Sequence, residues 1–491
     1  SKLFTMSKFA TLLLLIFLSG LATAQPKKFT LEQSIRLAQQ SGPNAQMARN
    51  SFRRKTFSYR SFNSGLLPRL MLNGIVPDYQ RAINPVLQND GTTQFLTQSQ
   101  AYSTASLTLS QPLVFSGGSV FVSSGLSRTD LFGAINSTYW RSSPLVVGIT
   151  QPLFQLNSLW WDNKLNDLYY SQAEKKFNED MEEASIDVTQ KFFDVYVASM
   201  RVGNAELNVA INDTLLKVSR GRYEVGKIDE NDLLQSELAL ANAKTAFSNA
   251  QLDHKIALRT LAIALGISDE EIDGIVPPEE LAAISVSTET AINQAHQNRS
   301  DLVSYELQKT NAQRQLRSQE LSNGFNANIT ASFGYNQTAT ELRDVYQNPL
   351  EQQAARLDFS VPLFQWGKGS SAVAAAREDL ERTETSIKLQ EKSFDQEVEA
   401  AADRFLRNQQ QLHLSSTADT IAQKQYLLAT NRYLIGKYDV TKLLLSQDAK
   451  DKARETLILT ERDYWLSYYQ LRRLTLYDFA TDSPIRYSVD L

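Results

Sequence analysis

The sequence predicts a mainly α-helical chain with a membrane β part, built as two tandem copies of one structural unit. The tetrapeptide Pro-Leu-Phe-Gln occurs at 152–155 and again at 362–365, an offset of 210 residues. The segment 221–237 aligns with 431–447 at the same offset. Two separated blocks that share one offset indicate a tandem duplication, so the function should be read from a repeated architecture. Long heptad stretches predict the helices, and alternating apolar and polar runs predict the strands.

Residues 1–24 are expected to form a secretory signal peptide that is cleaved before Gln25. Lys2 and Lys8 precede a short apolar run, and an Ala-Thr-Ala segment of small residues follows it. The apolar run is too short for a comfortable transmembrane helix, although an uncleaved anchor is the alternative. No later stretch is apolar enough to cross a membrane as a helix, so a membrane part would have to consist of strands.

The composition argues against several classes of chemistry. The chain contains no cysteine, which excludes a disulfide framework, a thiol nucleophile and a lipid on an N-terminal cysteine. Its three histidines are isolated in the sequence, which argues against a metal centre. The net charge of -4, without basic clusters, gives no indication of nucleic-acid binding. No nucleophile–base set or phosphate-binding loop is apparent, so we expect neither an enzyme nor a cofactor.

Each repeat is expected to contain one very long helix. From 157 to 220 there is no proline, and apolar residues recur every seven positions. A heptad seam of this kind keeps long helices supercoiled together, and about 60 residues would span about 90 Å. A generic coiled-coil rod is the alternative for these segments alone. The seam residues are Val188, Val195, Val202, Val209 and Leu216 in the first repeat, and Phe394, Val398, Ala401, Phe405 and Leu412 in the second.

Shorter helices are expected beside the long ones. Helical patterns span 31–63 and 289–321 ahead of the strands, and they resume at 231–265 and 440–477 after the long helices. A shorter return helix, stacked end to end on one of the early helices, would match one long helix in length.

The boundaries of the two repeats follow from these elements. The segment 271–288 contains Pro-Pro and several acids, and it is expected to be the linker. It separates a first repeat at 25–270 from a second repeat at 289–491. The tight turns that reverse each long helix are expected at 221–230 and 431–440.

Alternating runs predict strands of membrane-crossing length. In 324–337, apolar side chains from Phe325 to Tyr335 alternate with small polar ones, and shorter runs lie at 355–364 and 145–150. About eleven residues are enough to cross a bilayer as a tilted strand. A strand that packs on a protein core with one face would look similar. The small polar residues on the second face favour a water-filled lumen.

The first repeat is predicted to carry an extra strand hairpin. Residues 32–40 match 289–297 at an offset of 257, whereas the later blocks match at 210. The first half is therefore longer by 47 residues, the difference between the two offsets. Two alternating runs flank Ser116-Gly117-Gly118 inside this interval. The extra hairpin is expected at about 80–130.

The order and spacing of these segments resemble the TolC-like outer-membrane efflux protein family. This family supplies the outer-membrane factors of tripartite efflux or type I secretion systems. The resemblance rests on LEQSIRLAQQ from Leu31, LLPRL from Leu66, both PLFQ segments and both RY..GK turns. Each segment is a weak signal by itself, but their order, duplication and spacing are specific. The resemblance covers essentially the whole chain after residue 24.

The resemblance implies a homotrimer that exports substrates across the outer membrane of a Gram-negative bacterium. Strands from three copies would close an outer-membrane β-barrel in contact with lipid, and the helices would continue it as a coiled-coil α-helical barrel through the periplasm. A periplasmic adaptor protein and an inner-membrane pump of the RND or ABC type would be its partners. Members usually supply four strands per copy, so the insertion either raises the count to six or places a hairpin outside or inside the barrel. The alternative function is a periplasmic coiled-coil scaffold or adaptor, anchored by an uncleaved N-terminal helix.

The resemblance also implies roles for particular residues. The two RY..GK turns would form the periplasmic tip that contacts the adaptor, although their Gly and Lys residues could instead only cap a helical hairpin. Asp232 and Lys442 occupy matching positions and are candidate gate residues. Pro152 and Pro362 are expected at strand-to-helix turns, where ladder hydrogen bonds end. The tip residues are Arg222, Tyr223, Gly226, Lys227, Asp229, Arg432, Tyr433, Gly436, Lys437 and Asp439.

Overall fold

The chain folds into two compact units. A helical unit contains the described parts of Ser1–Phe52, Glu174–Arg299 and Ser393–Leu491, and a sheet unit contains those of Arg53–Ala173 and Ser300–Lys392. The expected signal peptide at 1–24 lies outside the described residues. So do the tip residues Gly436 and Asp439. The computed structural model describes residues 27–87, 90–133, 136–278, 284–435, 437–438 and 440–488.

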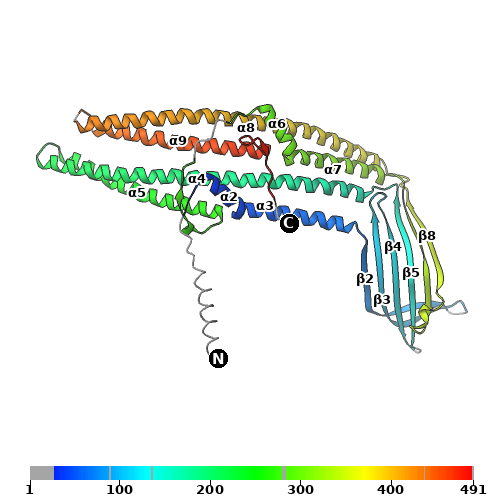
Figure 1. Cartoon of the computed structure of the whole chain (residues 1–491). Coiled ribbons are helices and arrows are strands. Elements are labelled where there is room, and N and C mark those ends of the chain that lie inside the picture. The colour runs from blue at the N-terminus through cyan, green and yellow to red at the C-terminus, as the bar shows by residue number, and fades with distance from the viewer. Residues whose placement is uncertain are drawn as a thin grey trace, which may run out of the picture. The chain divides into compact units, whose positions relative to one another are not determined.

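Both repeats contain the same four helices in the same order (Figure 1). Each helix has the same length as its counterpart, namely 11, 23, 67 and 36 residues. The tandem repeat predicted from the sequence is therefore confirmed. The first repeat has α2 (Leu31–Ser41), α3 (Pro43–Gly65), α4 (Ser158–Glu224) and α5 (Glu230–Leu265), and the second has α6 (Thr288–Asn298), α7 (Ser300–Ser322), α8 (Lys368–Leu434) and α9 (Val440–Thr475).

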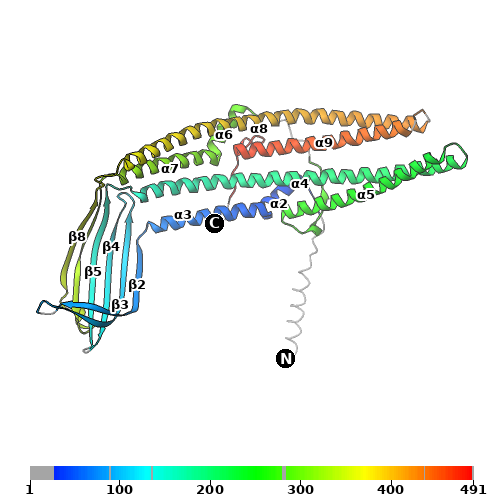
Figure 2. The same ribbon diagram turned by 180° about the vertical axis from the view of Figure 1, so that it is seen from behind.

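Each very long helix has its return helix beside it, α5 along α4 and α9 along α8, in both Figure 1 and Figure 2. The predicted heptad seam is buried over part of α4. Val188 and Val195 are buried on α4, next to Phe192 and Phe193. Further along α4, Val202 is only half-buried, so the seam loosens toward the turn. None of the helices in the described ranges is long and apolar enough to cross a membrane.

Two helices predicted as continuous are each broken once. The expectations at 31–63 and 289–321 were wrong in this respect, because extended residues interrupt them at Gly42 (φ -62, ψ 146) and Arg299 (φ -75, ψ 150). Gly42 precedes Pro43, and the residue before a proline avoids the α conformation. A side chain at Gly42 would also meet the backbone oxygen of Ala264 at 2.6 Å. The two breaks are 257 residues apart, so they occupy the same position in the duplicated unit.

The sheet unit contains one antiparallel sheet of six strands, in the order β2-β3-β4-β5-β7-β8. Within the described residues, the strand number that the sequence left open is thus six for this sheet. All six strands belong to one continuous hydrogen-bonded ladder, so the extra hairpin lies in line with the others (Figure 1). The strands are β2 (Arg69–Leu87), β3 (Thr93–Leu113), β4 (Gly118–Phe132), β5 (Ser137–Leu153), β7 (Asn326–Ala339) and β8 (Leu350–Ser360).

The last strand differs from its expected bounds. The sequence placed it at 355–364, whereas β8 starts earlier and its pairing with β7 ends at Ser360. Pro362 has no N–H to donate, which is consistent with the ladder ending just before it. Two small sheets belong to the helical unit. In these, β1 (Lys27–Phe29) pairs with β6 (Ile272–Ile275), at the start of the expected linker, and β9 (Tyr477–Asp478) pairs with β10 (Ser483–Pro484).

The six-stranded sheet has one apolar face and one largely polar face. Side chains alternate between faces along each strand, so the pairing register assigns every residue to a face. A continuous row of direct partners, Leu70, Leu109, Val122, Val147 and Phe333, crosses five strands of the apolar face. All five side chains are exposed. Leu72, Leu107, Val120, Leu145, Ile149, Ile329, Leu357 and Phe359 lie on the same face and are also exposed.

The polar face carries mostly small side chains. One row of direct partners contains Ser119, Thr150, Thr330 and Arg356. Phe121 is an exception whose ring covers Gly148, where an added Cβ would meet the ring at 2.3 Å. The alternation of apolar and polar residues that predicted the strands therefore also gives the complete sheet one apolar and one polar face.

Candidate functional site

The turn between α4 and α5 is closed by a Schellman motif. Gly226 has φ +70, a conformation that glycine adopts without strain. The Gly226 N–H donates to the carbonyl of Tyr223 at 2.9 Å, and the Lys227 N–H donates to that of Arg222 at 2.8 Å. These two bonds satisfy carbonyls that the end of α4 would otherwise leave unpaired. Capping accounts for Gly226 without any partner, whereas the side chain of Lys227 is exposed.

The start of α5 is capped by an acid. The carboxylate of Asp229 accepts from the backbone N–H of Asp232 at 2.9 Å, as expected of an N-cap residue. Glu230 and Asp232 add negative charge to the first turn, where the helix dipole favours it. Asp232 is therefore placed where its charge stabilises the helix.

The turn between α8 and α9 differs from the first turn in its side chains. The Lys437 N–H donates to the Arg432 carbonyl at 2.8 Å, which repeats the longer Schellman bond. The Arg432 guanidinium donates to the Tyr438 hydroxyl at 2.7 Å and lies 5.2 Å from the centre of its ring. The Lys442 ammonium lies 5.5 Å from the same ring. Of the expected tip residues, Gly436, Asp439 and the side chain of Tyr433 lie outside what the structure describes.

Tyr438 lies in this second turn, and the sequence analysis missed it. Its counterpart in the first repeat is Ile228, so the duplicated pattern did not single it out. The signal that could have found it is its position between Lys437 and Lys442. Lys442 is the third residue of α9, where the helix dipole disfavours a cation, and the tyrosine ring offsets part of that cost.

Both turns expose apolar side chains. Val225 is 67% exposed, and Ile435 at the second turn is 65% exposed. Tyr223 is also exposed. Exposed apolar side chains that are rimmed by polar residues are found at protein-interaction sites.

The strand-to-helix turns contain the expected prolines in unequal settings. Pro152 is the last but one residue of β5, and Phe154 just beyond it has φ 59. Pro362 lies between β8 and α8, where Trp366 and Gly367 have positive φ. The two Pro-Leu-Phe-Gln segments therefore lead from strand to helix through different backbone conformations.

A related Gln-Pro-Leu segment ends β3 and was also missed. Gln111-Pro112-Leu113 precedes Gln151-Pro152-Leu153 by 40 residues. The Gln111 side chain donates to the carbonyl of Leu66 at 2.8 Å and to that of Pro112 at 2.7 Å. Gln151 makes the same pair of bonds with Ser116 and Pro152, both at 2.8 Å. β3 thus ends as β5 does, and its Gln-Pro-Leu sequence was the available signal.

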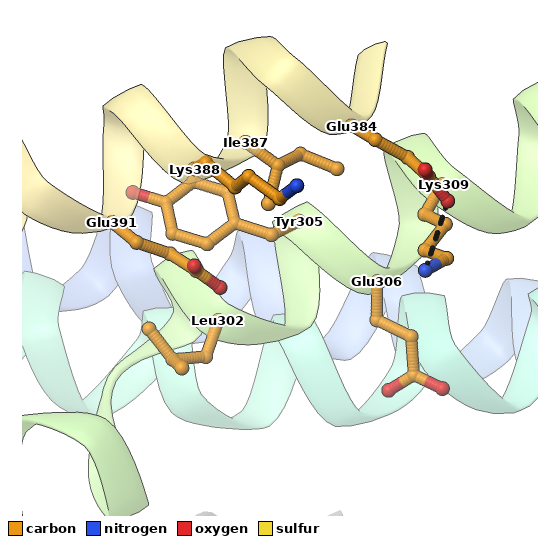
Figure 3. Close-up of a pocket in the computed structure, with 8 residues that line it drawn as sticks. All are labelled: Leu302, Tyr305, Glu306, Lys309, Glu384, Ile387, Lys388 and Glu391. Atoms are coloured by element: carbon orange, nitrogen blue, oxygen red, sulfur yellow. Dashed lines mark ion pairs between the residues drawn. The ribbon is translucent and has the colours of Figure 1, made fainter. Parts of the chain in front are cut away.

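A groove of about 460 Å³ lies between α7 and α8 in the sheet unit (Figure 3). Tyr305 and Ile387 supply its apolar part. The Lys309 ammonium points toward Glu384 and pairs with its carboxylate at 3.0 Å. No reaction chemistry follows from this mixture of carboxylates and ammonium groups. The lining residues are Leu302, Tyr305, Glu306, Lys309, Glu384, Ile387, Lys388 and Glu391.

A buried ionic cluster connects α4, α9 and the C-terminal segment inside the helical unit. Glu182 of α4 is fully buried and pairs with Arg472 of α9 at 3.1 Å. Glu182 also accepts from the hydroxyl of Tyr487, and Arg472 pairs with Asp478 at 3.1 Å. Burial raises the pKa of Glu182 and outweighs the nearby guanidinium. Burial also acts to raise the pKa of Asp478, but the Tyr468 hydroxyl and Arg472 outweigh it and lower that pKa.

These features coincide with those of a known family. The sequence matches the outer membrane efflux protein family over residues 34–267 and 291–475. The chain belongs to this family. The resemblance inferred from the sequence is thereby confirmed. The outer membrane efflux protein family consists of outer-membrane channel proteins and not of enzymes. Among curated proteins, none matches the sequence.

Solved structures share the fold over nearly the whole chain. The CmeC outer-membrane channel of Campylobacter jejuni is 13% identical, with a TM-score of 0.64, and the match covers 93% of this chain and 90% of CmeC. The outer-membrane protein VceC of Vibrio cholerae is 13% identical, with a TM-score of 0.63 and coverages of 91% and 95%. The outer-membrane channel OprN is 14% identical, with a TM-score of 0.63 and coverages of 92% and 94%. At such identities the likeness establishes the predicted fold class alone.

Proposed function

We propose that this protein is a trimeric outer-membrane channel-tunnel that exports substrates delivered by a periplasmic adaptor and an inner-membrane pump. The observation that carries the proposal is the row of paired apolar residues from Leu70 to Phe333 on one face of the sheet. In water, exposed apolar surface costs about 25 cal/mol per Å² relative to an apolar environment. Membrane lipid would remove that cost, while the polar face would border a water-filled lumen. Family membership supports the same interpretation.

The assignment of faces supports a placement in the cell. The sheet would lie in the outer membrane of a Gram-negative bacterium, and most of the mass, which is helical, would lie in the periplasm. The helices would form the coiled-coil wall of the tunnel, and three copies would be needed to close it. The expected signal peptide at 1–24 would direct export from the cytoplasm.

The two helical turns would be the part that meets the adaptor. The exposed Val225 and Ile435 supply apolar contact area, and the exposed Lys227 and Lys437 supply charge. The pump would be of the RND or ABC type and would be reached through the adaptor. The mixed character of these turns supports contact with a protein rather than with lipid.

Fractionation tests the placement. We expect the protein in the outer membrane as a detergent-stable trimer whose N-terminal residue is Gln25. A chain that is released by a salt wash, or that follows the inner membrane, would instead support the periplasmic scaffold.

Photocrosslinking tests the partner. A photoreactive residue in place of Lys227 or Lys437 should capture one periplasmic adaptor protein. The matched control is the same residue in place of Lys55, an exposed lysine of α3 in the sheet unit, which should not capture it. Equal capture from Lys55 and from the two turns would argue against the proposed docking site.

A further inference from the structure

The extra hairpin of the first repeat lies within the sheet. β2 and β3 pair from Arg69 to Leu87, with an irregularity between Ile75 and Asp78, and β3 pairs with β4 from Ser99 to Leu113. The order of the strands makes β2 one edge of the sheet and β8 the other. The apolar face is continuous through the added strands, because Leu70 and Leu109 are in the same row as Val122. The insertion therefore widens the wall without changing which face is apolar.

We propose that β2 of one copy pairs with β8 of the next copy, so that three copies close a barrel of 18 strands. This inference rests on the trimer of the proposed function. Six antiparallel strands in a row give the two edge strands opposite directions. β8 and a neighbouring β2 can therefore pair antiparallel, as every other neighbouring pair in the sheet does. Closure also removes the unpaired edge groups that lipid cannot satisfy.

The two edge strands have the character of strands that are to be paired. Leu72 on β2 is 74% exposed and Phe359 on β8 is 69% exposed, both on the apolar face. Edge strands that stay free often carry charged residues or a proline, and β2 does contain Pro77 and Pro85, so pairing is supported by the apolar face that the two edges share. The apolar side chains of β2 and those of β8 lie on the same face of the sheet, so the apolar face would continue across the junction between two copies. On the polar face, Arg69 of β2 and Asp358 of β8 lie at the helix-proximal ends of their strands. Asp358 already pairs with Arg356 of its own strand at 2.8 Å.

The added strands set the width of the conduit at the membrane. With a strand spacing of about 4.8 Å and a tilt of about 40°, 18 strands close at a diameter of about 36 Å between backbones. Twelve strands, four from each copy, would close at about 24 Å. Barrels of 16–18 strands enclose an aqueous channel. The rows of Ser and Thr on the polar face suit bulky hydrophilic cargo, which such a lumen would select by size more than by charge.

Disulfide crosslinking tests the seam between copies. The chain contains no cysteine, so every crosslink can be assigned to introduced residues. We expect Leu72→Cys, combined in turn with Ala355→Cys, Leu357→Cys or Phe359→Cys, to give disulfide-linked dimers and trimers in outer membranes after oxidation. Three positions on β8 are tested because the pairing register between β2 of one copy and β8 of the next is not fixed by the single chain. The matched control is Val122→Cys on β4 with the same three partners, which should give no intermolecular crosslink.

The outcomes separate this inference from the proposed function. Crosslinks from Val122 rather than Leu72 in an intact trimer would mean that the wall has four strands per copy, and the inference would be wrong. Crosslinks from Leu72 in an assembly that is not a trimer would keep the seam but contradict both the 18 strands and the proposed trimer. Cryo-electron microscopy of the unmodified protein measures the wall directly, so the inference does not depend on the folding of variants. A barrel of 12 strands in that image would overturn it.

Discussion

The helical parts of the two repeats agree residue for residue in length, whereas the strand parts differ by 47 residues. All four helix pairs are equal, including the 67-residue α4 and α8. An inserted residue in a long packed helix rotates every later side chain by about 100° and destroys the seam with its neighbours. A hairpin inserted into an antiparallel sheet returns the chain to the end where it left, so the following helix starts in the same place. Length is therefore fixed in the helices, and pairs of strands can be added to the sheet.

The helices that agree in length still differ in chemistry at the buried ionic cluster. Glu182 of α4 pairs with Arg472 of α9. Their duplicated counterparts are Lys392 and Ala262, which cannot form the same pair. The cluster therefore joins a helix of the first repeat to a helix of the second in one direction only. Duplication preserved the lengths, and later substitution made the two halves unequal.

The largest expected effect is that of Glu182→Leu. The substitution leaves the guanidinium of Arg472 short of a partner in a buried site, and breaking a buried pair in this way costs about 3–5 kcal/mol. The urea midpoint of the purified protein, followed by helical circular dichroism, should fall accordingly. Lys392→Leu is the matched control at the duplicated position, where the side chain is exposed, and it should change stability by no more than about 0.5 kcal/mol. If both substitutions lowered the free energy of unfolding equally, the ionic cluster present in only one direction would not contribute to stability.

A smaller loss is expected from Gly226→Val at the first turn. A β-branched residue at φ +70 is strained by about 1–2 kcal/mol, and the Schellman bonds would weaken with it. The change should appear as faster hydrogen exchange at the ends of α4 and α5. Gly221→Ala, in the helix five residues earlier, has open space around its Cβ and serves as the control. If the valine leaves exchange at the turn unchanged, Gly226 is not needed as a cap.

Much of this architecture follows from the sequence because its signals are periodic. The heptads, the alternating strands and the two offsets each repeat often enough to outweigh local exceptions. They predicted the long helices and the excess in the first half. The buried ionic cluster could not be predicted in this way. Glu182, Arg472 and Asp478 are far apart in the chain and come together only through helix packing, and single acids and bases on helices are usually solvated.

The helix breaks show a different kind of limit. Pro43 was visible in the sequence, but its counterpart Ser300 carries no such signal, although the chain is extended at Arg299 just before it. The break in the second repeat could have been found only by transferring the first along the offset of 257. Tyr438 at the second turn has no tyrosine at its duplicated position in the first repeat. Comparison of the two repeats therefore finds the features that they share and misses those that occur in one repeat only.

A gain of stability is expected from Gly203→Ala in α4. Gly203 lies inside the helix, and no atom beyond the helix's own neighbouring backbone lies within 4 Å of the place that an added Cβ would occupy, so alanine causes no clash. Glycine in a helix interior costs about 0.5–1 kcal/mol relative to alanine. The thermal midpoint should therefore rise. The counterpart in α8 is His413, and His413→Ala should have a smaller effect because only a difference in helix propensity changes there. A fall in the midpoint for Gly203→Ala would indicate that this part of α4 must bend.

The smallest contribution to stability per contact is expected from Asp232 and Lys442, the residues that we propose form the gate. They are the third residues of α5 and α9, so the duplication places opposite charges at matching points of the two turns. An exposed pair of this kind contributes about 0–1 kcal/mol, but three copies around one entrance add up. We expect Lys442→Asp to replace attraction by repulsion and to raise the conductance of the reconstituted channel. Lys442→Arg keeps the charge and should not, and the double exchange Asp232→Lys/Lys442→Asp should restore the low conductance. If Lys442→Asp conducts as the unmodified channel does, the two turns are closed by some other contact, and the inequality between the repeats at this point has no part in gating.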